Sequence, residues 1–355
     1  MRIGSFKYLS PLLIYVGAVQ SFTSHGWNCY IPLIYAWIII PVLELLFKPD
    51  PDNLSAAEEE MAKQNRLYDF ILYAVVLLEF PVLYLFLHSM IDPVLSISDK
   101  IGRIGSMGLI CGTFGINVGH ELGHRVKPFE QWLAKFSLMT SLYMHFFIEH
   151  NKGHHKRVAT PDDPSSARYG EMLYSFWFRS IIFSYLSAWH IAKNDCRKKG
   201  KSVFSLGNEM IQVHIIQLAW IVVIYMLFGY PVIFYYLGAA LMGILLLETV
   251  NYIEHYGLSR KMIQQGKYER AMPEHSWNSD HVLGRIMLFE LSRHSDHHYL
   301  ASRKYQVLRH HDDAPQMPTG YPGMMLLSLV PPVWFSIMNK RIRSLSNRVK
   351  TGVAV

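Results

Sequence analysis

The amino-acid sequence predicts an all-α integral membrane protein with six transmembrane helices and a cytoplasmic helical cap. Three observations lead to this fold class. Hydrophobic residues make up 51% of the 355 residues and charged residues only 17%, well below the roughly 25% of charged residues in soluble domains. Long stretches contain no Asp, Glu, Lys or Arg. Lys and Arg gather between these stretches, as they do in the cytoplasmic segments of membrane proteins.

The apolar stretches fit helices that cross a bilayer, which need about 20 predominantly apolar residues. The stretch from Tyr8 to Leu43 can hold two such helices with a turn near Gly26, and the stretch from Met210 to Leu247 divides near Gly229. We expect one integral-membrane domain over residues 1–355, with spans at residues 8–24, 28–47, 68–91, 103–120, 210–229 and 231–255. The first run lacks a small-residue cleavage site, so we expect an uncleaved span.

The distribution of basic residues predicts the orientation of these spans. With both termini in the cytoplasm, residues 125–209 and 256–355 are cytoplasmic, and residues 125–209 are rich in Lys and Arg. The external turns near residues 25 and 230 contain neither residue type, as the positive-inside rule requires. We read residues 133–148 and 321–338 as helices that do not span, and residues 256–282 as a polar, loop-rich segment.

Charge and cysteine content exclude several classes of function. The net charge is +7, but no basic stripe with interleaved aromatic residues is present, so we expect no nucleic-acid partner. The three cysteines, Cys29, Cys111 and Cys196, are far apart and form no CxxC pair. This pattern argues against a cysteine-based zinc or iron–sulfur site, a fused rubredoxin-type module and a disulfide framework.

Histidines at helical spacing are the main functional signal. His120 and His124 form HxxxH, residues 150–155 form HxxxHH, residues 294–298 form HxxHH, and a lone His255 ends the sixth predicted span. Residues at i, i+3 and i+4 share one helix face, so each group presents its imidazoles in one direction. Imidazole binds iron, copper, nickel and zinc.

Nine candidate ligands exceed what one transition metal binds, so the sequence predicts two metal ions. The candidates are His120, His124, His150, His154, His155, His255, His294, His297 and His298. In the proposed topology, the three histidine motifs and His255 all lie at the cytoplasmic face of the membrane. The other nine histidines lack partner histidines at ligand spacing or lie on the external side of the membrane in the proposed topology. Among these nine, His275 and His281 are the least securely excluded as metal ligands.

Two kinds of metal chemistry remain open from the motifs alone. Residues 120–124 match HExxH, in which Glu121 would be the general base of a zinc protease. That interpretation leaves six clustered histidines unexplained, whereas a pair of redox-active irons explains all nine. Neutral imidazoles would then need carboxylates that accept the outer ring N–H. The candidates nearest in sequence are Glu121, Glu149, Asp162, Asp163, Glu254 and Asp296.

These motifs resemble those of the membrane alkane 1-monooxygenases, the alkane omega-hydroxylases within the fatty-acid desaturase and hydroxylase group. The matching segments are residues 120–125, 149–155, 158–168, 251–257, 293–298 and 305–306. The segment Asn-Tyr-Ile-Glu-His-Tyr-Gly at residues 251–257 is the most diagnostic, because simple desaturases have no such motif. Ser292 and residues 299–303 depart from the family pattern without changing a candidate ligand.

The resemblance implies a cofactor, an oxidant and partners. It implies two non-haem iron ions held by the nine histidines, O2 as co-substrate, and electrons from rubredoxin through its reductase. It implies terminal hydroxylation of medium-chain n-alkanes that enter from the lipid of a bacterial inner membrane. The basic residues Lys152, Lys156, Arg157 and 197–199 are candidates for steering an acidic donor.

The substrate and two rival functions stay open at this point. Trp37, midway along the second span, is a candidate for the side chain that stops the alkane in its channel. A fatty-acid desaturase or hydroxylase, or an enzyme acting on the methyl groups of alkylbenzenes, would use the same metal site. A metal carrier or sensor would instead place its histidines at several depths.

Overall fold

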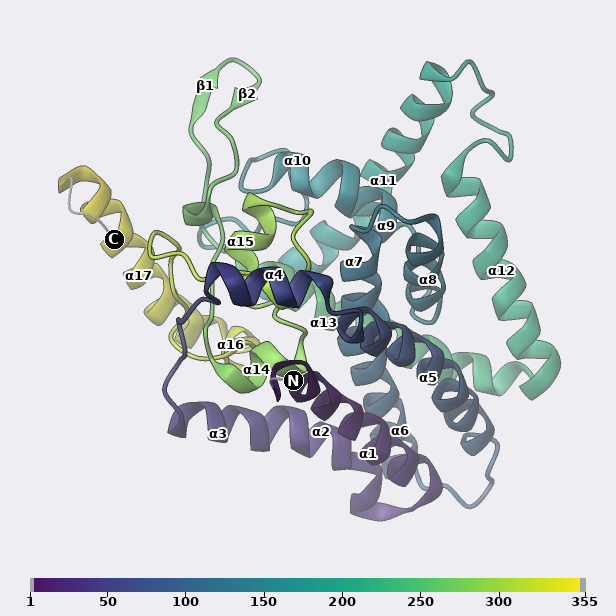
Figure 1. Ribbon diagram of the computed structural model, residues 1–355. Helices are drawn as coiled ribbons and strands as arrows, with labels where there is room; N and C mark the ends of the chain where they lie inside the picture. The colour runs from purple at the N-terminus through teal and green to yellow at the C-terminus, as the bar shows by residue number, and fades with distance from the viewer. Residues whose placement is uncertain (1–2, 352–355) are drawn as a thin grey trace. The chain divides into compact units, whose positions relative to one another are not determined.

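The computed structural model describes residues 3–351 and is mostly helical (Figure 1). The chain forms two compact units that alternate along the sequence. The first comprises residues 1–38, 66–153 and 185–247, and the second comprises residues 39–65, 154–184 and 248–355. The predicted single-domain organisation stays a prediction.

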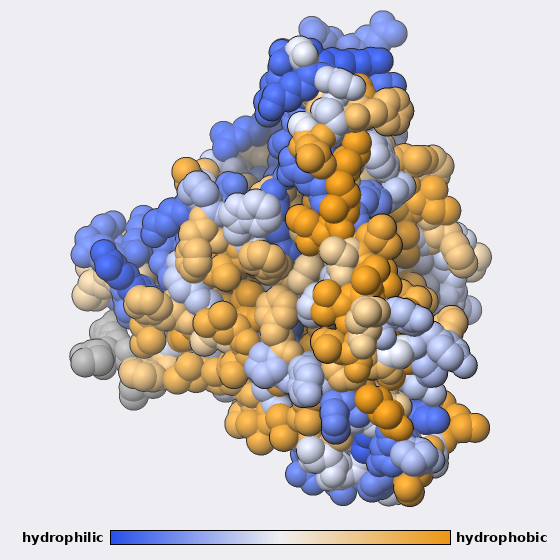
Figure 2. All heavy atoms as spheres, turned by 90° about the vertical axis from the view of Figure 1, so that its right-hand side faces the viewer, coloured by the Kyte–Doolittle hydropathy of each residue, from blue (hydrophilic) through white to orange (hydrophobic). Residues whose placement is uncertain are grey.

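Long apolar helices dominate the first unit. They are α5 (Leu67–Ser89), α6 (Ile97–Ile110) with η4 (Cys111–Ile116) and α7 (Asn117–Gly123), α12 (Glu209–Phe228) and most of α13 (Tyr230–His255). Ser96 begins α6 with a capping box, in which its hydroxyl accepts from the Asp99 N–H and the Asp99 carboxylate accepts from the Ser96 N–H. Figure 2 shows apolar side chains gathered over the face that carries α12, as a lipid-facing helix requires.

Five helical segments are long and apolar enough to cross a membrane among the described residues. They are Gly26–Leu46, Leu67–Ser89, Ile97–Gly123, Glu209–Phe228 and Tyr230–His255. These correspond to predicted spans two to six. The first predicted span, residues 8–24, is not among them. These residues lie in the 3-10 helix η1 (Ile3–Leu12), which contains Pro11, and in α1 (Leu13–Thr23).

The segment Gly26–Leu46 is helical but irregular. It consists of η2 (Gly26–Tyr30), α2 (Ile31–Ile34), the π-helical η3 (Tyr35–Ile39) and α3 (Ile40–Leu46). Proline lies near the start of α2 and of α3, each of which continues from a preceding helical turn.

Residues 133–148, expected to be one helix, are broken in the middle. Helix α8 (Pro128–Met139) ends there, Leu142 adopts φ 53°, and α9 (Phe146–Glu149) follows. A leucine at positive φ cannot continue a helix. The segment is not among the five candidate spans. The glycines of α7 allow α8 to approach closely, since a Cβ at Gly119 would lie 2.9 Å from Leu138 Cγ and 3.2 Å from the Ala134 carbonyl oxygen.

The second unit contains shorter helices and the only strands among the described residues. Its elements are α3, α4 (Ala56–Gln64), α10 (His155–Arg157), the start of α11 (Leu173–Lys198), the end of α13, β1 (Met262–Gln264), β2 (Lys267–Tyr268), η6 (Pro273–His275), α14 (Val282–Met287), α15 (His294–Tyr299), η7 (Tyr305–Val307), α16 (Tyr321–Ser328) and α17 (Pro331–Thr351).

Three expectations for this unit need correction. The polar segment 256–282 contains the antiparallel hairpin β1–β2, so the protein is not purely α-helical. Residues 321–338 form two helices, because Pro331 and Pro332 begin α17 rather than interrupt a longer helix. The 26-residue helix α11 was not predicted within residues 125–209.

Candidate metal centre

Four buried histidines of the second unit form a compact group, which we call the quartet. His154, His255, His294 and His298 come from the end of η5 (His150–His154), the end of α13 and α15. One ligand atom from each lies within 4.8 Å of the others. The Nε2 atoms of His154 and His298 are 3.2 Å apart, as are those of His294 and His255.

The quartet fits a transition metal. Two nitrogens bound to one ion at about 2.1 Å are about 3.0–3.4 Å apart in octahedral or tetrahedral geometry. The observed Nε2 separations fall in this range. Burial, and then the neighbouring His294, lower the pKa of His298 well below its ordinary value. A neutral imidazole keeps the lone pair that a metal requires.

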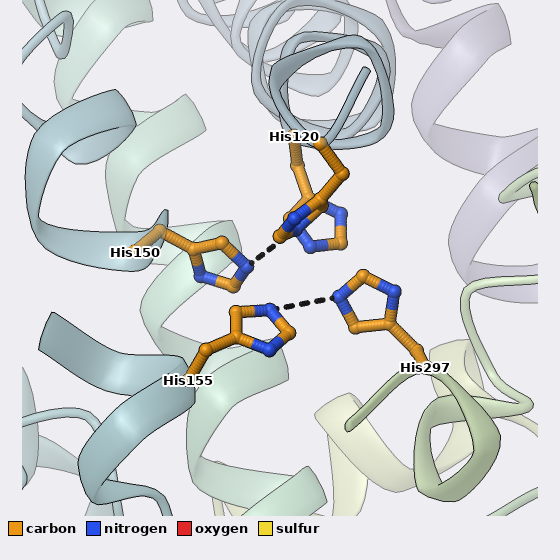
Figure 3. Close-up of side chains that lie close together, drawn as sticks. His120, His150, His155 and His297 are labelled. Atoms are coloured by element: carbon orange, nitrogen blue, oxygen red, sulfur yellow. Dashed lines mark hydrogen bonds between the residues drawn. The ribbon is translucent and has the colours of Figure 1, made fainter. Parts of the chain in front are cut away.

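Three histidines of the first unit form a second group, the trio. His120 lies in α7, His124 directly follows it, and His150 begins η5. The Nε2 atoms of His150 and His124 are 3.1 Å apart, and the ring centroids of His120 and His150 are 4.3 Å apart. Figure 3 shows the His150 ring directed toward the place where His120 projects from its helix.

His155 and His297, both in the second unit, form a pair. Their Nε2 atoms are 3.1 Å apart and face each other, as the dashed line between them in Figure 3 shows. Burial lowers the pKa of His297 well below its ordinary value, with a smaller contribution from His155. The neutral His297 ring can therefore direct a lone pair toward an ion shared with His155.

The groups do not coincide with the sequence motifs. His150, His154 and His155 of HxxxHH belong to the trio, the quartet and the pair in that order. His297 of HxxHH belongs to the pair, whereas His294 and His298 belong to the quartet. The expectation that each motif directs its imidazoles one way therefore holds for His120 and His124, which share the trio, and is wrong for the other two motifs. Adjacent residues on a helix differ by about 100° in direction, and residues 150–154 are π-helical.

Two of the expected carboxylates contact quartet histidines from different sides. The Asp163 carboxylate Oδ2 accepts from His154 Nδ1 at 2.9 Å, on the side of the ring away from Nε2. Burial alone would raise the pKa of Asp163, but the His154 ring and its hydrogen bonds hold that pKa below its ordinary value. Glu254 Oε2 lies 3.1 Å from His294 Nε2, the same nitrogen that faces His255.

The other four expected carboxylates have different surroundings. Glu121 accepts from Arg125 Nη2 at 2.6 Å, and Arg125 also pairs with Asp69. Asp296 accepts from Arg303 and from His311 Nε2, at 2.6 and 2.7 Å. Glu149 is buried and Asp162 is exposed. Asp296 thus anchors the chain that follows α15.

The sequence did not predict the side chains that hold the carboxylates of Asp163 and Glu254. The Ser166 hydroxyl donates to Asp163 Oδ2 at 2.6 Å, and its position three residues after Asp163 was the available signal. The Tyr321 hydroxyl donates to Glu254 Oε1 at 2.8 Å across 67 residues, and no sequence signal connects the two. Both contacts fix the orientation of an acid beside a quartet histidine.

The remaining candidates lie as follows. Trp37 is half-buried in η3. His275 Nδ1 accepts from the Met272 N–H at 3.0 Å and its Nε2 lies 3.2 Å from Glu269, while His281 Nδ1 lies 3.0 Å from the Ser279 hydroxyl. These two histidines thus have partners outside the trio, the quartet and the pair.

Comparisons with known proteins give close relatives over nearly the whole chain. The model of the fatty acid desaturase family matches residues 104–328. The chain is 38% identical over 339 residues to an alkane 1-monooxygenase 2 of Alcanivorax borkumensis, covering 95% of this chain and 88% of the relative. It is 40% identical over 309 residues to an alkane 1-monooxygenase 1 of Pseudomonas aeruginosa, covering 86% and 80%.

A more distant relative has a different substrate in its name. The chain is 29% identical over 267 residues to the xylene/toluene monooxygenase hydroxylase component XylM of Pseudomonas putida. This alignment covers 70% of this chain and 66% of the relative.

Proposed function

We propose that this chain, which belongs to the alkane 1-monooxygenases of the fatty acid desaturase family, hydroxylates the terminal carbon of medium-chain n-alkanes. The reaction consumes the alkane, O2, two electrons and two protons, and it yields a 1-alkanol and water. The observation that carries this proposal is the combination of close relatives over most of the chain with nine clustered histidines. The family resemblance expected from the motifs is confirmed.

The cofactor we propose is a pair of non-haem irons. We assign one iron to the quartet, and we propose the other five histidines as further iron ligands. When bound, the irons supply the activation of O2 that breaks a terminal C–H bond. The protein's part is to keep the imidazoles neutral and oriented and to exclude water, which the burial of all four quartet histidines supports.

The substrate must be recognised by shape. An alkane offers no hydrogen-bonding group, and transfer from lipid to an apolar channel yields little of the roughly 0.8 kcal/mol per CH2 that burial from water gives. We therefore propose that a bulky side chain in the channel, with Trp37 as candidate, sets how far the chain enters. Methyl groups of alkylbenzenes are the second candidate substrate, favoured by the similarity to XylM.

We further propose a multi-pass protein of the bacterial inner membrane with six spans, both termini in the cytoplasm and the histidines in a cytoplasmic cap. The excess of Lys and Arg in residues 125–209 supports this orientation. In this arrangement the metal site faces the compartment that supplies the electrons.

Rubredoxin, reduced by its reductase, is the electron donor we propose, and the hairpin β1–β2 is its best docking candidate. Lys261 and Lys267 are exposed. The base of the hairpin binds the chain beside the ligands: Arg260 Nη2 donates to the Lys156 carbonyl at 2.8 Å, and Arg270 Nη2 donates to the Tyr299 carbonyl at 3.1 Å. Lys152, expected to attract the donor, is partly neutralised by Asp195 at 2.7 Å.

Reversing both hairpin charges tests the donor site. In the Lys261→Glu/Lys267→Glu variant we expect the KM for rubredoxin to rise roughly tenfold at low salt and to depend less on salt, because steering is electrostatic. The comparison variant Lys198→Glu/Lys199→Glu reverses charges in residues 197–199, the rival steering site expected from the sequence. A rise in KM in that variant alone would place the donor there and not at the hairpin.

The proposed activity is tested with the purified protein in lipid. Octane, toluene and a fatty acyl substrate are offered separately with O2 and reduced rubredoxin, and iron is measured by metal analysis and Mössbauer spectroscopy. We expect 1-octanol and two irons per chain. Oxidation of the acyl substrate alone, or zinc in place of iron, would refute the proposal.

A further inference from the structure

A fully buried acid of the first unit, Glu79 in α5, has no role in the proposed reaction. Its side chain is 0% exposed. Ser137 Oγ lies 2.9 Å from Glu79 Oε2, and Thr140 Oγ1 lies 2.5 Å from Glu79 Oε1. Among the described residues, no Lys, Arg or His forms an ion pair with it. An uncompensated charge at such a place would be very costly.

The number of protons in this network determines the state of the acid. Thr140 Oγ1 lies 2.5 Å from Glu79 Oε1 and 2.6 Å from the Ser137 carbonyl oxygen, and its hydroxyl has one proton. If Glu79 were ionised, one of these two short contacts would join two oxygens with no proton between them. A proton on Glu79 Oε1 removes the conflict: Glu79 donates to Thr140, Thr140 donates to the Ser137 carbonyl, and Ser137 Oγ donates to Glu79 Oε2.

We propose that Glu79 is a neutral carboxylic acid that positions the helix carrying His120 and His124. The acid links α5 to the end of α8 through the two hydroxyls. It also packs against η4, since a Cβ at Gly115 would lie 2.5 Å from Glu79 Oε1.

The contact at Gly115 is what connects Glu79 to the trio. Gly115 precedes His120 by five residues in one continuous helical segment, and that segment contains the π-helical turn η4. A π-turn changes the rotation of everything that follows it, so a side chain that fixes the turn fixes the direction of His120. Glu79 is therefore a positioning residue rather than a ligand.

Infrared difference spectroscopy tests directly whether the Glu79 carboxyl group is protonated. At pH 7 we expect the spectrum of the protein minus that of Glu79→Gln to contain the C=O stretching band of a protonated carboxylic acid, and we expect this band to shift in Thr140→Val. The control variant Glu209→Gln should show an ionised carboxylate, because Glu209 pairs with Lys135 at 2.7 Å. An ionised carboxylate signal from Glu79 would overturn the proposal.

Metal retention tests the positioning role, which rests on the proposed ligand role of His120 and His124. The amide of Glu79→Gln donates once to Thr140 and accepts once from Ser137, so we expect that variant to retain iron under chelator challenge. Glu79→Leu removes the acceptor of the Ser137 hydroxyl and the donor to Thr140, and we expect about tenfold weaker retention. Equal loss in both variants would overturn the positioning role. If the unmodified protein binds no iron, the proposed function fails. The infrared result still shows whether Glu79 is protonated.

Discussion

Single residues around the quartet differ in which ring nitrogen they approach. Asp163 contacts Nδ1 of His154, whose Nε2 faces His298. A carboxylate in this position fixes the tautomer and the ring orientation and increases the basicity of the ligand nitrogen. Glu254 approaches Nε2 of His294 and so lies on the side where the quartet nitrogens converge.

Replacing Asp163 by Asn should weaken metal binding. The amide cannot accept as strongly from His154 Nδ1 and can present N–H to it, so we expect a 10–100-fold loss of metal affinity. Iron per chain after a chelator series measures this. Asp162→Asn, one residue away and exposed, is the matched control and should bind iron normally; parallel losses in both variants would contradict the assignment.

Replacing Trp37 by Ser should extend the range of accepted alkanes. Removing the indole lengthens the channel, so a longer chain can enter before its terminal carbon reaches the metal site. Products from n-alkanes between hexane and octadecane measure the range. A product profile identical to that of the unmodified protein would remove Trp37 as the stop.

Among the structural elements, the segments that carry the histidines have unusual backbones. η4 and η5 are π-helical, and Phe289 and Glu290 adopt φ 51° and 59° shortly before α15. Non-glycine residues at positive φ are strained and are retained where the surroundings enforce them. Here the Glu290 carboxylate accepts from Arg285 Nε at 2.7 Å and its carbonyl accepts from the Arg293 N–H at 2.9 Å. These contacts place His294 at the start of α15.

Adding one methyl group to α7 should separate it from α8. In Gly119→Ala the new Cβ would meet Leu138 at 2.9 Å, and such overpacking costs about 1–3 kcal/mol. The control Gly238→Ala, in α13, meets only Ile104 at 3.4 Å and should gain the helix propensity of Ala. Thermal unfolding in detergent should show a lower Tm for Gly119→Ala alone. Equal Tm values would show that α7 and α8 tolerate a wider separation.

For the molecule as a whole, the number of spans determines whether the two termini lie on the same side of the membrane. Five segments of the described chain are long and apolar enough to span, and residues 8–24 form η1 and α1 instead of one long α-helix. η1 and α1 together run without a break from Ile3 to Thr23. This run is not among the candidate spans, so the six-span topology stays a proposal.

Protease protection can distinguish six spans from five. Epitope tags at the two termini should both be protected in intact spheroplasts and both be cleaved in inverted vesicles, because an even number of spans places them on the same side. A cysteine at Asp92 should react with an impermeant reagent in spheroplasts. Opposite protection of the two tags would contradict the six-span topology.

The sequence by itself determined the family, the apolar segments that fit a membrane and the histidines that we propose as ligands, because each depends on residue type and local spacing. Apolar length predicts a span, and several histidines close together in the sequence indicate a metal site. Only the tertiary structure decided that His154 joins the quartet whereas its neighbours His150 and His155 do not, that Tyr321 holds Glu254, and that Glu79 meets Thr140. The physical reason is that a helix turns by about 100° per residue, so which neighbour each side chain meets depends on the packing of segments far apart in the sequence.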